Sequence, residues 1–258
     1  MGAQDLKADG QLPERRSVTV REINDFNDRT NFRAEGVIFD FDGTLGDSMW
    51  VWENLDVAFL ENRGQVYDAE FGEVMRSLPF RDAAQYAKDR YGFKDSVEAI
   101  TAQWFEMAQD RYRDDVKLKP GAKDCLSWLK TKKIPLVVCT ASVPQLVVTA
   151  LRSNGIEDWF EAIITEHDVM VPKSEPDMYW AGAERIDVPP ERCVVFEDVL
   201  HGLEGAKKGG FNAVAVFDEI SSASKWEHMK VVADYAMPDA FERFENERIF
   251  LPGGWFVS

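Results

Sequence analysis

The sequence lacks the marks of a membrane or secreted protein. None of its 258 residues belongs to an uncharged apolar run of about eighteen residues, the length that a membrane-spanning helix needs. The opening segment, MGAQDLKADGQLPERR, has no apolar stretch of the signal-peptide kind. The sequence contains no internal repeat and no low-complexity segment. These absences predict a cytoplasmic protein that does not engage a membrane.

Cysteine is scarce and widely spaced. The chain has only three, Cys125, Cys139 and Cys193, and no two form a C-x-x-C pair. Each lies in an apolar context, which is typical of small buried side chains. A disulfide framework is therefore not expected, and a reducing compartment fits this pattern.

Basic residues are outnumbered: 30 Lys and Arg stand against 46 Asp and Glu, for a formal net charge of −16. Such an acidic surface argues against non-specific binding to nucleic acid or to anionic membranes. An anionic substrate would have to be attracted locally, by a cation, against the field of the whole molecule.

Short apolar runs indicate the fold. Runs without polar alternation are typical of strands that are covered on both faces, as in a parallel sheet. Helix-period segments over 123–133, 145–155 and 202–210 separate the later runs, and the last two end in glycine, as helices often do. Alternating strands and helices predict an α/β fold with a Rossmann-like parallel sheet. The runs are VIFD (37–40), PLVVC (135–139), AII (162–164), CVVFE (193–197) and AVAVF (213–217).

The gap between the first two runs is too long for one crossover. Residues 48–116 contain no strand-like run and have helical periodicity, which predicts an inserted helical domain hinged over the sheet. The core domain would then comprise 35–47 and 117–245. An N-terminal extension (1–34, containing SVTV at 17–20) and an apolar tail (246–258) complete the chain. The tail would pack on its own domain or form a dimer contact, so we expect a monomer or a homodimer.

The first run ends in the carboxylates Asp40 and Asp42, within D-F-D-G-T. Alternate residues of an extended strand share a face, so both carboxylates point the same way and repel each other unless a cation or a proton intervenes. Ligands of open α/β sheets bind beyond the carboxyl ends of the strands. The alternative, a simple Asp-Gly turn, is the weaker interpretation.

Polar residues also follow the second and third runs. Thr140, Ala141 and Ser142 precede a helix, where a hydroxyl and free N–H groups would bind an anion. The alternative is an ordinary helix N-cap. Lys173 opens a loop that enters a helix near Glu175 and Asp177, and it is either a site residue or a solvated lysine.

The fourth run ends in Glu197-Asp198, a pair that suits a hard cation with oxygen ligands. The alternative is an exposed acidic turn. His201 follows, and we expect it at the surface near a helix start rather than as a ligand, because magnesium rarely takes imidazole when carboxylates are available.

Together these segments resemble the haloacid dehalogenase superfamily. The resemblance rests on VIFDFDGTL, LVVCTAS, KSEPD and VVFEDVLHGLEGAKKGG, in that order, and spans about 36–218. The insertion after the first motif is similar to the cap of the branch that includes β-phosphoglucomutase and phosphoglycolate phosphatase.

The resemblance implies a phosphatase that acts on a small phosphate ester. Asp40 would be the nucleophile and Asp42 the general acid and base, while Thr140, Ala141, Ser142 and Lys173 would hold the phosphate. Mg²⁺ would be held by Asp40, the backbone carbonyl of Asp42, Asp198 and Glu197. True dehalogenases need neither the metal nor the second Asp, so the resemblance argues against dehalogenation.

The resemblance also raises two rival functions. A sugar-phosphate mutase of the β-phosphoglucomutase type usually has a His about twelve residues after the nucleophile, where this chain has Trp52, and Thr44 also departs from the mutase pattern. A non-catalytic sensor would be expected to have lost a motif residue.

Arg81 lies where related enzymes place a substrate-facing cap residue, although a solvated Arg at a helix start is an equal alternative.

Overall fold

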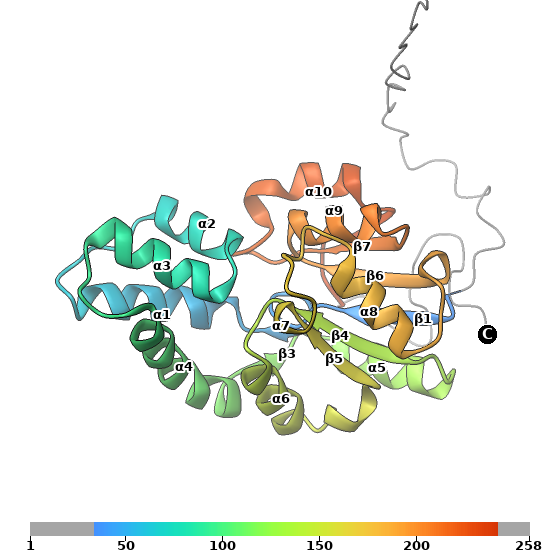
Figure 1. Ribbon diagram of the computed structural model, residues 1–258. Coiled ribbons are helices and arrows are strands. Elements are labelled where there is room, and N and C mark those ends of the chain that lie inside the picture. Colours follow the sequence, from blue (N-terminus) through green and yellow to red (C-terminus); the bar gives the residue numbers. More distant parts are fainter. Residues whose placement is uncertain (1–33, 242–258) are drawn as a thin grey trace, which may run out of the picture.

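The computed structural model describes residues 34–241, and at its centre lies a six-stranded sheet (Figure 1). The strand order is β5-β4-β1-β6-β7-β8, and each neighbouring pair is parallel. The α/β fold with a parallel sheet, as predicted from the sequence, is confirmed. The strands are β1 (Gly36–Phe39), β4 (Leu136–Thr140), β5 (Ala162–Thr165), β6 (Cys193–Glu197), β7 (Asn212–Val216) and β8 (Tyr235–Met237).

The strands are uninterrupted apolar runs because both faces of the sheet are covered. Val37 and Phe39 of β1 belong to one buried cluster, while Ile38 belongs to the other. The alternation of side chains along a strand produces this division. Helices α5 (Ala122–Thr131) and α6 (Pro144–Ser153) contribute to the first cluster, which also extends into the helical residues between 49 and 114. The helices that contribute to the second cluster are α8 (Asp177–Arg185), α9 (Leu200–Lys208) and α10 (Trp226–Val232).

The predicted strands and helices lie within two residues of the observed ones. Gly155 (φ 69°) and Gly210 (φ 84°) adopt the left-handed conformation just beyond α6 and α9, as expected of glycines that end helices. The strand β8 and the short helix α7 (Glu166–Val169) were not predicted, because three or four residues are too few for a recognisable pattern. The described part of the core also contains three short 3₁₀ helices: Glu157–Trp159, Pro190–Arg192 and Ala223–Lys225.

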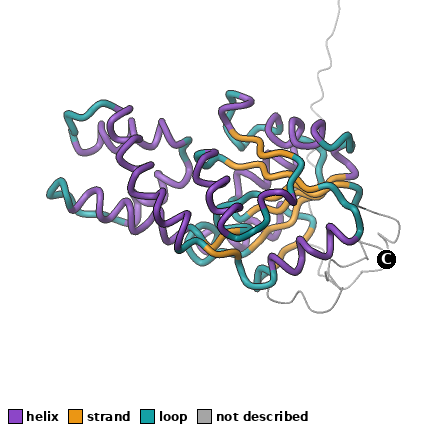
Figure 2. Tube along the Cα trace, turned by 90° about the horizontal axis from the view of Figure 1, so that it is seen from below, coloured by secondary structure: helices purple, strands orange, loops and turns teal. Residues whose placement is uncertain are grey.

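Four helices fill the long gap after β1, as predicted for residues 48–116. In Figures 1 and 2 they lie together at one end of the molecule, beside the sheet. The two ends of this helical segment are joined by a two-stranded antiparallel sheet, in which β2 (Gly46–Asp47) pairs with β3 (Lys117–Leu118). The chain thus leaves the core and returns to it through two adjacent strands. The helices are α1 (Met49–Glu61), α2 (Ala69–Ser77), α3 (Phe80–Tyr91) and α4 (Val97–Asp114).

The strand order reverses at β1. One part of the chain extends the sheet from β1 through β4 to β5, and the other extends it through β6 and β7 to β8. The carboxyl ends of β1, β4 and β6 are therefore neighbours, and this is where open parallel sheets bind their ligands.

The N-terminal SVTV segment and the apolar tail lie outside the described residues, so the expectation for the tail stays a prediction. Across residues 34–241, none of the helices combines the length and the apolar character that crossing a membrane requires. The three cysteines are buried and free, as their apolar contexts predicted.

Candidate active site

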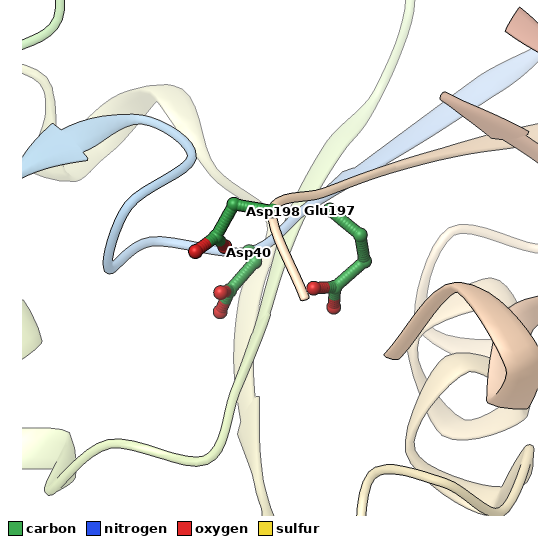
Figure 3. Close-up of side chains that lie close together, drawn as sticks. All are labelled: Asp40, Glu197 and Asp198. Carbon is green, nitrogen blue, oxygen red and sulfur yellow. The ribbon is translucent and has the colours of Figure 1, made fainter. Parts of the chain in front are cut away.

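Three buried carboxylates meet where β1 and β6 end (Figure 3). Asp40 follows β1, Glu197 ends β6 and Asp198 follows it. Each offers one oxygen, and these three oxygens lie within 4.8 Å of one another. Glu197 and Asp198 are fully buried, and Asp40 is 5% exposed. Strand pairing between β1 and β6 produces this meeting, because Phe39 pairs with Phe196 one residue before the carboxylates.

Lys173 reaches this group from the loop beyond β5. Its Nζ lies 2.7 Å from Asp40 Oδ1 and 2.7 Å from Glu197 Oε1, and its side chain is 2% exposed. Burial alone would lower the pKa of Lys173, but Asp40 and Glu197 outweigh it and hold that pKa above its ordinary value. The alternative of a solvated lysine is therefore wrong. Its backbone N–H donates to Glu166 Oε1 at 3.0 Å, which anchors the loop.

Glu197 and Asp198 point to different sides of the sheet edge, as adjacent residues of a strand do (Figure 3). Glu197 Oε1 accepts a 2.7 Å hydrogen bond from Tyr179 of α8 and contacts Lys173, while Oε2 is buried without a hydrogen-bond partner. Burial raises the pKa of Glu197 to about 7, although Lys173 opposes the rise. The exposed acidic turn proposed as an alternative is excluded, because neither residue is exposed.

Hydroxyl groups hold both oxygens of Asp198. Thr44 Oγ1 donates to Oδ1 at 2.9 Å, and Ser221 Oγ donates to Oδ2. Ser221 also contacts Asp218, whose Oδ2 forms a buried ion pair with Lys119 at 2.8 Å. Burial, with the charges of Asp40 and Glu197, raises the pKa of Asp198 well above its ordinary value.

The group fits a hard divalent cation. Three carboxylates and one ammonium group leave a formal charge of −2 when all are ionised (−3 + 1). Only carboxylate oxygens are offered, and Glu197 also has a buried oxygen, Oε2, that has no hydrogen-bond partner. Carboxylate oxygens of this kind suit Mg²⁺.

Asp42 is held by hydroxyl groups from both ends of the helical segment. Its Oδ1 accepts a 2.6 Å hydrogen bond from Ser48, at the start of α1, and another from the Tyr112 hydroxyl of α4. Burial raises the pKa of Asp42, and the two donated hydrogen bonds limit the rise. Burial and the adjacent Asp42 also raise the pKa of Tyr112 well above its ordinary value, so this phenol keeps its proton.

Thr140 ends β4 next to β1, and it does not cap the following helix. Its Oγ1 accepts a 3.1 Å hydrogen bond from the backbone N–H of Ser142, while the N-cap of α6 is Val143, without a side-chain hydrogen bond. The N-cap alternative is therefore wrong. The Ser142 hydroxyl is buried near Asp42 and Tyr112, without a hydrogen bond of standard geometry.

The sequence also singled out Arg81 and His201. Arg81, in the first turn of α3, forms an ion pair with Glu98 at 2.7 Å, and both side chains are about two-thirds exposed (67% and 65%). Its role toward substrate stays a prediction. His201 lies in the first turn of α9, as predicted, but it is half-buried rather than at the surface. Burial, followed by the charge of Lys173, lowers the pKa of His201 to about 4.

Several residues that support the site were not found from the sequence. Ser48, Tyr112, Tyr179 and Ser221 each donate a hydrogen bond to a site carboxylate. Tyr112 lies within a helix, where its position matches that of an ordinary core residue, and Ser221 lies in a loop without any pattern. No local signal distinguishes such residues, because their contacts cross 6 to 70 positions of the chain.

Comparison with known proteins agrees with this geometry. Residues 37–216 match the family model described as "Haloacid dehalogenase-like hydrolase". The chain belongs to this family. The match spans all the strand ends described above, from Asp40 to Asp198, and it confirms the resemblance found in the sequence.

Several curated relatives carry phosphatase names. The chain is 28% identical over 180 residues to the "Phosphorylated carbohydrates phosphatase" of Thermotoga maritima, covering 70% of this chain and 83% of that protein. It is also 28% identical over 184 residues to the "Fructose-1-phosphate phosphatase YqaB" of Escherichia coli, covering 71% and 97%.

Solved structures share the fold. CbbY from Rhodobacter sphaeroides, in complex with phosphate, superposes with a TM-score of 0.71 at 22% identity, covering 82% of this chain and 96% of that one. The β-phosphoglucomutase of Clostridium difficile superposes with a TM-score of 0.66 at 19% identity, covering 81% and 93%.

Proposed function

We propose that this chain is a magnesium-dependent phosphatase that hydrolyses a small phosphorylated metabolite, such as a sugar phosphate, through an aspartyl-phosphate formed on Asp40. The observation that carries the proposal is the contact of Asp40 with Lys173 inside a buried carboxylate group at the edge of the sheet. The names of the curated relatives, phosphatases of phosphorylated carbohydrates and of fructose 1-phosphate, support it.

In the first step an Asp40 carboxylate oxygen attacks the phosphorus of the substrate. The new bond joins that oxygen to phosphorus, and the ester bond between phosphorus and the leaving oxygen breaks. Asp42, protonated at this stage, gives its proton to the leaving oxygen, so an alcohol departs. Lys173 favours the step because its charge offsets that of the phosphoryl oxygens.

In the second step a water molecule attacks the phosphorus of the aspartyl-phosphate. Asp42, now a carboxylate, takes a proton from this water, and the bond between phosphorus and Asp40 breaks. Inorganic phosphate leaves, Asp40 regains its carboxylate, and Asp42 is protonated again. Each proton that Asp42 gives in the first step is thus recovered in the second.

Asp40, Asp198 and the backbone carbonyl of Asp42 would hold Mg²⁺, and Glu197 would assist directly or through water. When bound, the ion supplies positive charge that offsets the phosphoryl group and lets a carboxylate approach it. Thr44 and Ser221 contribute by fixing the two oxygens of Asp198.

The remaining predicted residues would bind the phosphate and the rest of the substrate. Thr140, with Ala141 and Ser142 after it, would hold phosphoryl oxygens beside Asp40. Helices α1 to α4 would act as a cap over the site, which is the domain division that the sequence predicted. Arg81 would have to leave its exposed ion pair with Glu98 to meet a substrate.

Phosphatase assays test the proposal directly. We expect the full chain to hydrolyse p-nitrophenyl phosphate and members of a sugar-phosphate panel with Mg²⁺, and to lose at least about 100-fold in kcat/KM when EDTA removes the metal. Asp40→Asn should lower kcat by about 10³-fold or more, because the nucleophile is lost. The matched control is Asp47→Asn, an exposed carboxylate seven positions along, which should keep full activity.

Other outcomes would favour other functions. Turnover that survives Asp40→Asn would refute Asp40 as nucleophile. No turnover with any divalent metal would favour a sensor. Transfer of phosphate from a sugar bisphosphate to glucose phosphate, faster than hydrolysis, would favour a mutase.

A further inference from the structure

Two aromatic residues that the proposed mechanism does not use form a hydrogen-bonded chain that leads to Asp42. Trp52 of α1 and Tyr112 of α4 are hydrogen-bonded to each other, and Tyr112 is hydrogen-bonded to Asp42. Both aromatic residues belong to the helical segment, while Asp42 belongs to the loop that follows β1. The contact between Tyr112 and Asp42 spans 70 positions of the sequence.

The direction of these hydrogen bonds is fixed by chemistry. The indole Nε1 of Trp52 can only donate, and it does so to the Tyr112 hydroxyl oxygen at 2.8 Å. A phenol carries one hydrogen, which Tyr112 then gives to Asp42 Oδ1. Trp52 therefore orients the Tyr112 hydroxyl, and Tyr112 in turn restrains the Asp42 carboxyl group.

Packing makes the Tyr112 ring a rigid support. Its side chain is fully buried, and its ring lies 5.9 Å from that of Trp52 and 6.5 Å from that of Phe41, centroid to centroid. Phe41 is the residue between Asp40 and Asp42, so the same ring packs beside the backbone that carries both. Rotation of the Asp42 side chain would break the contact that Tyr112 makes through Oδ1.

Ser48 completes the restraint from the other end of the helical segment. Its hydroxyl donates to the same oxygen, Asp42 Oδ1, at 2.6 Å. With Oδ1 fixed by two donors, Oδ2 is the oxygen that is left to exchange a proton with a leaving group or with water.

We propose that Tyr112, oriented by Trp52, is a positioning residue for Asp42 that couples proton transfer at the leaving oxygen to the placement of helices α1 and α4. This inference rests on the proposed function, because it assigns Asp42 to proton transfer. Tyr112 itself does not touch the reacting atoms.

Leaving-group dependence separates this role from a merely structural one. A sugar phosphate releases an alkoxide that must be protonated, whereas p-nitrophenyl phosphate releases a stable phenolate that needs little help. The ratio of kcat/KM for these two substrates measures the use of Asp42 in the first step. General damage to the fold or to phosphate binding lowers both values alike and leaves the ratio unchanged.

We expect Tyr112→Phe to lower kcat/KM for the best sugar phosphate by about 10- to 100-fold and for p-nitrophenyl phosphate by less than about threefold. Trp52→Phe should change the ratio in the same direction by a smaller factor, because Tyr112 keeps its bond to Asp42 but loses its orientation. Since Trp52 is only half-buried, this variant also serves if Tyr112→Phe folds poorly.

Two tyrosines provide matched controls. Tyr91→Phe removes a hydroxyl that contacts the Val66 carbonyl at 3.4 Å, and it should leave kcat/KM unchanged for both substrates. Tyr179→Phe removes a buried hydroxyl that donates a hydrogen bond to Glu197. If this variant lowers kcat/KM, it should do so by the same factor for both substrates.

The outcomes distinguish this inference from the proposed function. A wild-type chain that hydrolyses neither substrate contradicts the proposed function itself. A wild-type chain that hydrolyses both, with Tyr112→Phe and Trp52→Phe leaving their ratio unchanged, overturns the positioning role alone. The positioning role is also overturned if Tyr179→Phe shifts the ratio as much as Tyr112→Phe does.

Discussion

Ser221 shows how a single hydroxyl can matter to the proposed metal site. It donates to Asp198 Oδ2 and contacts Asp218 Oδ1, so it links a proposed magnesium ligand to a carboxylate already paired with Lys119. Groups that orient metal ligands typically contribute about 10- to 100-fold to metal affinity. We expect Ser221→Ala to raise the Mg²⁺ concentration for half-maximal activity by about 10-fold, with little change in kcat at saturating metal.

A magnesium titration of phosphatase activity checks this prediction. Ser224→Ala is the matched control, since Ser224 lies in the same stretch and is exposed. An unchanged half-activating concentration in Ser221→Ala would show that Thr44 and the fold already orient Asp198 fully.

The sequence predicts the carboxylates of the site but not the residues that donate hydrogen bonds to them. Asp40, Glu197 and Asp198 stand at the ends of apolar runs, and elementary strand geometry brings them together. Tyr112 and Ser221 contact the same group from α4 and from the loop beyond β7, and their positions depend on how whole segments pack. Local patterns predict residues of the first kind because strands align them, and they miss the second because packing is a property of distant residues.

At the scale of elements, the same contrast holds for the fold. Runs such as CVVFE and AVAVF identified β6 and β7 because strands buried on both faces need only apolar side chains. The two-residue strands β2 and β3 escaped detection, although they join the helical segment to the core. Their pairing of Gly46 with Leu118 involves residues that are 72 positions apart, and no local periodicity marks it.

Helix α9 and the loop that carries Lys173 are held together at Gly205. A Cβ built at Gly205 would lie 2.2 Å from the backbone oxygen of Lys173, a contact that neither backbone can absorb without moving. Replacing glycine by alanine inside a helix normally stabilises it by about 1 kcal/mol. Here we expect the opposite sign: Gly205→Ala should cost about 1–3 kcal/mol through overpacking. A displacement of Lys173 by about 1 Å should also lower kcat by up to about 100-fold.

Thermal or denaturant unfolding, together with kcat on p-nitrophenyl phosphate, measures both effects. Gly155→Ala is the control: its φ of 69° is strained for alanine, while a Cβ at this position would approach only Lys123 Nζ, at 3.9 Å. It should lose about 1 kcal/mol of stability and keep its kcat. A Gly205→Ala variant that is more stable than the wild type would contradict the close approach of α9 to this loop.

At the scale of the whole molecule, the formal charge of −16 opposes an anionic substrate. Lys173 supplies a buried positive charge at the site, and the proposed Mg²⁺ would be equally local. Salt screens the long-range repulsion between solvent-exposed charges far more than it screens short-range attraction between buried groups, since the Debye length falls to about 8 Å at physiological ionic strength.

Ionic strength should therefore act on this enzyme with an unusual sign. With Mg²⁺ kept saturating, we expect kcat/KM for a sugar phosphate to rise about two- to fivefold as KCl increases from about 10 to about 150 mM. A sugar bisphosphate that is also hydrolysed should show a steeper rise, because the repulsion grows with substrate charge, while kcat should change little for either. A steady fall of kcat/KM with salt would contradict this prediction. It would mean that the electrostatic potential at the entrance of the site is positive, and that the acidic residues lie too far from the substrate to repel it.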